Sequence, residues 1–175
     1  VVLDPVMVST SGCKLISDQA ITAITQQLIP ITEIITPNLS ETEILTGIHA
    51  HDQETMYQAA KILLSQGCKA ALIKGGHLEG NRMCDLLLTK ESETPYLLEA
   101  LKVESKNTHG TGCSLSSAIA TFLALEYPLP IAVEKAKEYV YQGIIAGKDV
   151  QIGKGHGPLN HFFAPHPMHI FTKNE

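Results

Sequence analysis

Short β-branched segments alternate with longer amphipathic segments along this 175-residue chain, and this alternation constrains the fold more than any other feature. Each short segment stops at proline, glycine or a polar residue, whereas the longer ones repeat apolar residues at helical spacing. The predicted strands are Val1–Leu3, Ile31–Thr36, Ala70–Ile73, Met83–Leu88 and Tyr96–Val103. The predicted helices are Ser17–Leu28, a short helix from Ser40 to about Gly47, Asp52–Gln66, Gly112–Leu125 and Ile131–Ile145. The order predicts an α/β fold with a largely parallel sheet, to which the Met83–Val103 pair adds an antiparallel edge.

The composition narrows the classes of function. Hydrophobic residues make up 44% of the chain and charged residues 18%, which is typical of one globular domain. The formal net charge of −5 and the absence of Trp argue against a nucleic-acid partner and against an anionic membrane surface. No apolar run approaches the length of a membrane span. The four cysteines lie far apart without a C-x-x-C pair, which fits a reducing cytoplasm better than a disulfide framework: Cys13, Cys68, Cys84 and Cys113.

The segment Asn107–Ser114 is the most informative motif. Gly110 and Gly112 bracket Thr111, Cys113 follows at once, and a predicted helix continues from there. Glycine lets the backbone approach a ligand closely, and a helix start offers unpaired N–H donors with partial positive charge. The motif therefore predicts a phosphate cradle, with Cys113 as a base or nucleophile whose thiolate the helix start favours. The alternative is a structural turn with an inert buried thiol.

Polar motifs follow three of the other predicted strands: Asp4-Pro5, Pro37-Asn38 and Lys74-Gly75-Gly76-His77. Because ligands bind beyond the carboxyl ends of parallel strands, we expect these motifs and the glycine loop to converge on one sheet edge. Phosphoryl transfer needs such a collection of N–H donors, a cation and a divalent ion. Lys74 is the candidate cation, and Asp4 and Glu41 are candidate Mg²⁺ ligands through water. Alternatively, Asp4 is a turn residue, Glu41 a first-turn helix acid and Lys74 a solvated strand end.

The C-terminal part of the sequence carries a basic loop, Gly153-Lys154-Gly155-His156-Gly157-Pro158. Such a loop is suited to cover bound phosphates, and the alternative is a plain surface turn. The histidines after it do not share one helical face and have no cysteine or acid cluster beside them, so they do not favour a metal site. These histidines are His156, His161, His166 and His169.

The motifs together resemble one family. They are Asp4-Pro5-Val6-Met7, Thr36-Pro37-Asn38-x-x-Glu41, Lys74-Gly75-Gly76-His77, His109-Gly110-Thr111-Gly112-Cys113 and Gly153 to His161. In this order they closely resemble the bacterial hydroxymethylpyrimidine/phosphomethylpyrimidine kinases of the ribokinase superfamily, up to about Phe162. The resemblance implies a ribokinase-like three-layer α/β/α fold with a mostly parallel central sheet.

The resemblance also implies that residues 1–175 are the C-terminal part of a single kinase domain. The chain begins Val1-Val2-Leu3-Asp4-Pro5 without Met, as if inside a buried strand. We therefore expect preceding residues that carry the N-terminal strands and much of the substrate pocket. We expect the isolated chain to lack activity and to self-associate through the open flank of its first strand.

The activity implied is ATP- and Mg²⁺-dependent phosphorylation of 4-amino-5-hydroxymethyl-2-methylpyrimidine, and then of its monophosphate, in thiamine biosynthesis. The resemblance implies a cytoplasmic enzyme with small-molecule substrates only, which forms a homo-oligomer, expected to be a dimer. Two alternatives stay open. One is a related pyridoxal or pyridoxine kinase, and the other is a non-catalytic nucleotide-binding fragment.

Residue roles follow from the same resemblance. The loop of Gly110, Thr111 and Gly112 would form the anion hole for the transferred phosphoryl group, with Cys113 as the catalytic base. The nucleotide phosphates would contact Lys74, Thr111, Lys154 and Gly155. The pyrimidine would lie near Val6, Met7 and Cys113. Asp4 and Glu41 would organise Mg²⁺. Ser114 stands where the family commonly has threonine, which keeps the hydroxyl.

Overall fold

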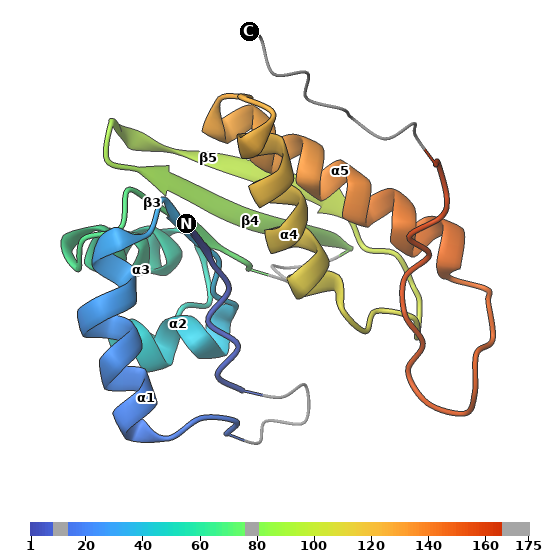
Figure 1. Ribbon diagram of the computed structural model, residues 1–175, viewed down its shortest axis with the longest axis horizontal. Coiled ribbons are helices and arrows are strands. Elements are labelled where there is room, and N and C mark those ends of the chain that lie inside the picture. The colour runs from blue at the N-terminus through green and yellow to red at the C-terminus, as the bar shows by residue number, and fades with distance from the viewer. Residues whose placement is uncertain (9–13, 76–80, 166–175) are drawn as a thin grey trace, which may run out of the picture.

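A five-stranded sheet organises the protein, as seen in a computed structural model that describes residues 1–8, 14–75 and 81–165 (Figure 1). Its strands are β1 (Val2–Leu3), β2 (Ile34–Ile35), β3 (Ala70–Ile73), β4 (Arg82–Thr89) and β5 (Ser92–Leu101), in that spatial order. β1, β2 and β3 pair in parallel, whereas β3–β4 and β4–β5 pair antiparallel. The α/β class and the antiparallel edge are confirmed. In the described residues the sheet is mixed, because the β4–β5 hairpin supplies half of its pairings.

The helices match the predicted segments closely. They are α1 (Asp18–Ala23), α2 (Leu39–Thr46), α3 (Gln53–Ser65), α4 (Thr111–Ala124) and α5 (Leu129–Gly147). Side chains of Ser17, Asn38 and Asp52 cap the first three helices, and Gly47 ends α2 at φ 74°. α1 continues through a π-helical turn, Ile24–Leu28, into a 3₁₀ turn, Ile29–Ile31. Pro30 is the second residue of that turn, which includes Ile31, so the second strand starts later than the predicted Ile31.

Two cores cover the two faces of the sheet and make three layers. Successive residues of a strand point to opposite faces. On β3, Ala71 and Ile73 join the core formed with α2 and α3, whereas Ala70 and Leu72 join the core formed with α4 and α5. Figure 1 shows α4 and α5 side by side over one face of the sheet. The predicted three-layer α/β/α arrangement is confirmed, and β3 is buried on both faces.

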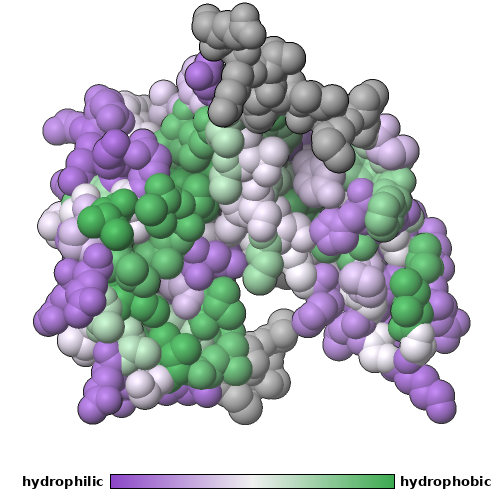
Figure 2. All heavy atoms as spheres, viewed as in Figure 1, coloured by the Kyte–Doolittle hydropathy of each residue, from purple (hydrophilic) through white to green (hydrophobic). Residues whose placement is uncertain are grey.

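β1 lies at one edge of the sheet and is only half-buried. The predicted strand at Val1–Leu3 is confirmed, and its outer flank is open because β2 is its one sheet neighbour among the described strands. Val1 is 70% exposed, and Ile31 and Leu15 are also exposed hydrophobics. Figure 2 shows hydrophobic residues gathered on the face that carries β1 and α1. None of the helices in the described ranges is long and apolar enough to cross a membrane.

Candidate active site

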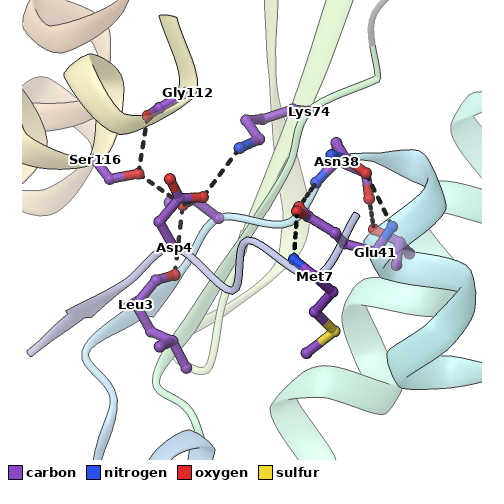
Figure 3. A network of polar contacts seen from close by, with 10 residues as sticks. Leu3, Asp4, Met7, Asn38, Glu41, Lys74, Gly112 and Ser116 are labelled. Atoms are coloured by element: carbon purple, nitrogen blue, oxygen red, sulfur yellow. Dashed lines mark hydrogen bonds and ion pairs between the residues drawn. The ribbon is translucent and has the colours of Figure 1, made fainter. Parts of the chain in front are cut away.

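The carboxyl ends of β1 and β3 bring an acid and a cation together. Asp4 follows β1 and Lys74 follows β3, and Lys74 Nζ lies 3.3 Å from Asp4 Oδ1 (Figure 3). The Lys74 N–H donates to the Pro37 carbonyl at 2.9 Å, which fixes the strand ends relative to each other. Both charged side chains are largely buried, at 18% exposure for Lys74 and 15% for Asp4. The pair is therefore desolvated enough to act strongly on a neighbouring charge.

The start of α4 faces this ion pair. A Cβ placed on Gly112 would lie 3.3 Å from Lys74 Nζ and 3.9 Å from Asp4 Oδ2. Gly110 precedes the helix at φ 85°, in the left-handed region that glycine adopts without strain. The Thr111 N–H donates to the Thr108 carbonyl, whereas helix geometry gives the next two first-turn N–H groups no intrahelical acceptor. The predicted convergence of the glycine loop with Asp4 and Lys74 is confirmed.

Two buried hydroxyls, those of Thr36 and Ser116, connect Asp4 to α4. Thr36 Oγ1 lies 3.5 Å from Asp4 Oδ1 and 2.9 Å from Ser116 Oγ, and Ser116 donates to the Gly112 carbonyl at 3.2 Å (Figure 3). Thr36 directly follows β2 and Ser116 lies one turn into α4, so the network joins the ends of β1 and β2 to α4. Sequence reasoning missed Ser116. Its signal was the i, i+4 spacing from Gly112, which places it on the sheet-facing side of the helix.

Cys113 is exposed and carries a raised thiol pKa. Partial burial raises the pKa most, and the negative charge of Asp4 and a hydrogen bond to it raise it further. Lys74 acts in the opposite direction, and its effect is smaller. The thiol pKa is thus raised, contrary to the expectation that the helix start favours the thiolate, because partial burial and the neighbouring Asp4 carboxylate outweigh the effect of Lys74. The alternative of a buried thiol is also wrong.

Glu41 binds backbone N–H groups of two segments near the Asp4–Lys74 pair. Its Oε2 accepts the Asn38 N–H at 2.8 Å, while Asn38 Oδ1 accepts the Glu41 N–H at 2.9 Å, which makes a capping box for α2. Its Oε1 accepts the Met7 N–H at 3.2 Å (Figure 3). Glu41 is only 3% exposed. Both oxygens thus bind backbone donors, and Glu41 fixes the turn after β1 to the start of α2.

Val6 and Met7, the predicted pyrimidine neighbours, have opposite environments. Val6 is 42% exposed and adopts φ 36°, a strained value for a β-branched residue. The Met7 side chain has no exposed surface and belongs to the core that contains Ile35 and Met56. Of the two residues, only Val6 is exposed.

A groove of about 920 Å³ runs from the ion pair along the β4–β5 hairpin and α5. Lys74, Thr111 and Gly112 line one end of it, with Asn38 and Thr108 beside them. Its apolar wall comes from the hairpin and the two helices: Met83, Leu98, Ala100, Leu115, Val140 and Ile144. A groove with a cation and helix-start N–H donors at one end and apolar walls elsewhere fits a ligand with both a phosphate and a flat ring.

Lys154 and Gly155 line a second cleft of about 640 Å³, together with Lys106 and Lys148. Glu104 and Ser105 belong to both clefts, so the two meet along the loop after β5. Asn107 connects the loop after β5 to the end of α5, because its Nδ2 donates to the carbonyls of Gly147 and Val150 at 2.7 Å and 2.5 Å. The structure thus places Lys154 apart from the groove end that Lys74 lines.

Within the described ranges, Asp4 fits one ligand of a divalent ion whose other ligands would be water and substrate phosphates. In the described part of the protein, no three His, Cys, Asp or Glu side chains come together as a metal site. Asp4 is a partly exposed carboxylate at the mouth of the N–H cradle. Magnesium is commonly held by one or two carboxylates, water and substrate phosphates, and this donor set fits that pattern. Gly76, His77, His166 and His169 lie outside the described residues.

Comparison with known proteins decides the family. The family model for phosphomethylpyrimidine kinase matches residues 1–160. The chain belongs to the phosphomethylpyrimidine kinase family. A hydroxymethylpyrimidine/phosphomethylpyrimidine kinase of Rhizobium meliloti is 43% identical to it over 162 residues, which cover 92% of this chain and 60% of the relative. The chain thus spans about 60% of the length of that relative.

Solved structures support the same placement. A phosphomethylpyrimidine kinase from Clostridium difficile is 38% identical, with a TM-score of 0.67, over 82% of this chain and 56% of that one. A pyridoxal kinase from Staphylococcus aureus, solved with AMP-PCP and pyridoxal, is 30% identical, with a TM-score of 0.80, over 91% of this chain and 56% of that one. These similarities confirm the ribokinase-like fold predicted for this member of the phosphomethylpyrimidine kinase family.

Proposed function

We propose that the chain supplies the phosphoryl-transfer centre of a kinase for hydroxymethylpyrimidine and its monophosphate in thiamine biosynthesis, with ATP and Mg²⁺. The observation that carries the proposal is the Lys74–Asp4 pair set against the start of α4. A cation, a carboxylate and a cradle of N–H groups are the parts that phosphoryl transfer requires. Family membership and the named relatives support this choice of substrates.

Each part has a distinct task in the proposed reaction. Lys74 and Thr111 bind the transferred phosphoryl group, and the N–H groups of the Gly110–Cys113 turn receive its developing negative charge. Asp4 holds Mg²⁺, which when bound with ATP supplies charge neutralisation between the phosphates. Glu41 fixes the turn that carries Asp4. If that turn opened, Glu41 would contact Mg²⁺ through water. Lys154 and Gly155 cover the more distant phosphates from their own cleft.

Cys113 is the proposed base for the hydroxymethyl group. Partial burial and the neighbouring Asp4 carboxylate raise its thiol pKa. Lys74 acts on the thiol in the opposite direction to Asp4, and Mg²⁺ held by Asp4 would supply further positive charge beside it. Val6 faces the pyrimidine in this proposal, and Met7 supports the same turn from the core.

Pyridoxal kinase is the second candidate. The specific observation is structural, since the pyridoxal kinase from Staphylococcus aureus has the higher TM-score of the two solved structures described above. The Clostridium difficile phosphomethylpyrimidine kinase has the higher identity, which favours the pyrimidine. A non-catalytic nucleotide-binding role is the third candidate and differs by the absence of any phosphoryl transfer.

A chimera separates these candidates. The matched region of the Rhizobium meliloti relative is replaced by the corresponding residues of this chain, and phosphorylation of hydroxymethylpyrimidine and of pyridoxal is followed by chromatography. Turnover of the pyrimidine that Cys113→Ala abolishes would support the proposal. Turnover of pyridoxal alone would select the second candidate. A folded chimera that binds Mg²⁺-ATP without transferring phosphate to either ring would select the third.

A further inference from the structure

A buried ion pair joins β4 to α5 outside the residues discussed so far. Lys137 Nζ lies 2.6 Å from Asp85 Oδ2 and donates to the Leu98 carbonyl at 2.9 Å. The side chain of Asp85 is 11% exposed and that of Lys137 is 17% exposed. A charged residue within the apolar run of β4 is costly to bury unless it is paired. Its presence therefore calls for a role beyond packing.

The Asp85 carboxylate binds the backbone directly next to Lys74. Its Oδ1 accepts the Gly75 N–H at 3.0 Å, directly after Lys74. A Cβ at Gly75 would collide with the Cys84 carbonyl and with Met56, so this backbone lies against the core and its N–H needs a buried acceptor. A carboxylate is a stronger acceptor than a neutral group. Asp85 thus fixes the backbone that carries the Lys74 ammonium.

The same carboxylate lies in the wall of the groove whose Lys74 end is proposed to bind the transferred phosphoryl group. Asp85, Lys74 and Lys137 all line that groove. Its other charged residues are mainly acidic: Glu99, Glu104, Glu134 and Glu138, with Lys102 as the one further lysine. An Asp85 without its partner would add a further negative charge to a groove for an anion.

We propose that Lys137 is a positioning residue that neutralises Asp85, so that Asp85 can hold Gly75 and Lys74 without repelling the phosphates bound beside them. The inference rests on the proposed function, because it assumes that the groove binds a nucleotide triphosphate. It assigns the ion pair an electrostatic task in ligand binding, in addition to its contribution to packing between α5 and the hairpin.

Three variants test it. Lys137→Met removes the ammonium, and the double variant Lys137→Met/Asp85→Asn removes both charges while Asn keeps an acceptor for the Gly75 N–H. Lys69→Met is the control, because Lys69 pairs with Glu33 at the opposite end of β3 and its loss changes the net charge equally. The Kd for Mg²⁺-ATP is measured by calorimetry at pH 8 and low salt, with Tm recorded for every variant.

We expect Lys137→Met to raise the Kd for Mg²⁺-ATP about tenfold, because the Asp85 charge would then be uncompensated and would repel the phosphates across a partly screened groove. The double variant should return to within about twofold of the unmodified chain, and Lys69→Met should not change Kd. The gap between single and double variants should narrow in high salt. If Lys137→Met does not fold, Lys137→Gln gives the same comparison, because it keeps a donor for Asp85.

The outcomes separate the inference from the function on which it rests. Unchanged Kd in Lys137→Met, or a double variant as weak as the single one, would overturn the electrostatic role alone. A lower Tm with unchanged Kd would leave the pair as a packing element only. If the unmodified folded chain binds no Mg²⁺-ATP, the proposed function fails and the inference falls with it.

Discussion

Replacing Lys74 by Met should weaken Mg²⁺-ATP binding while leaving the fold intact. Met keeps the length of the side chain and removes the ammonium, which lies 3.3 Å from Asp4 and points at the start of α4. Two unit charges about 4 Å apart interact by about 4 kcal/mol at an effective dielectric constant of about 20. Desolvation of the ammonium and the phosphate offsets part of this attraction, so that a net loss of about 2–3 kcal/mol remains.

That loss corresponds to a rise in the Kd for Mg²⁺-ATP of about 30- to 150-fold, which calorimetry resolves easily. Lys69→Met again serves as the control of equal charge, because Lys69 directly precedes β3 and Lys74 directly follows it. Binding of hydroxymethylpyrimidine to the chimera should change little, since this ring carries no phosphate. A Kd for Mg²⁺-ATP within twofold of the unmodified chain, in a variant with normal Tm, would refute the phosphate-binding role of Lys74.

Four further predictions follow from the site and the core. Cys113→Ala in the chimera should lower kcat by about 10²–10⁴ with unchanged Kd for Mg²⁺-ATP, and unaltered turnover would remove it as the base. Asp4→Asn should lower the thiol pKa of Cys113, because it removes the neighbouring negative charge. Iodoacetamide should then alkylate Cys113 faster at pH 8, and an unchanged or slower alkylation rate would contradict this prediction. Burial raises the pKa of Cys68 to about 11 from 9.0. The folded state therefore holds this proton more tightly than the unfolded state does, so the free energy of unfolding should fall by up to about 3 kcal/mol between pH 9 and pH 11. Cys68→Val should remove that part of the alkaline loss in urea melts, and identical pH profiles would argue against it. Ile31→Glu should reduce self-association of the purified chain, measured by sedimentation, because Ile31 is an exposed hydrophobic residue. Equal self-association of the variant and the unmodified chain would show that the contact between copies lies elsewhere.

Local chemistry accounts for the elements that the sequence predicted well. Ser17 and Asp52 have side chains that cap a helix start, and Gly47 adopts a left-handed conformation without strain, so the helix boundaries follow from single residues. The apolar run of β3 is buried on both faces, as a central strand of a three-layer fold requires. The 3₁₀ turn at Ile29–Ile31 did not follow from β-branched composition, because Pro30 and the packing of the preceding helix decided it.

Site residues were predictable where a motif follows a strand. Asp4, Lys74 and the glycine loop meet because parallel strands end at the same edge, which is a rule of topology. The ion pair of Asp85 with Lys137 was not predicted, since its partners are 52 residues apart and only the packing of α5 on the hairpin brings them together. An acid inside an apolar strand was the one signal that the sequence offered.

The sequence by itself determined the order of strands and helices, the family and the set of groups available for phosphoryl transfer. These depend on local spacing, capping and turn chemistry, which act over a few residues. Tertiary structure alone decided the state of those groups. It partly buried the Cys113 thiol and placed Asp4 beside it, and both effects raise the thiol pKa. It also turned both oxygens of Glu41 toward backbone donors. It also put Lys154 in a cleft separate from Lys74. Charge and hydrogen-bond effects depend on distances of a few ångströms between residues far apart in the chain, and such distances exist only once the sheet and its two helical layers have packed.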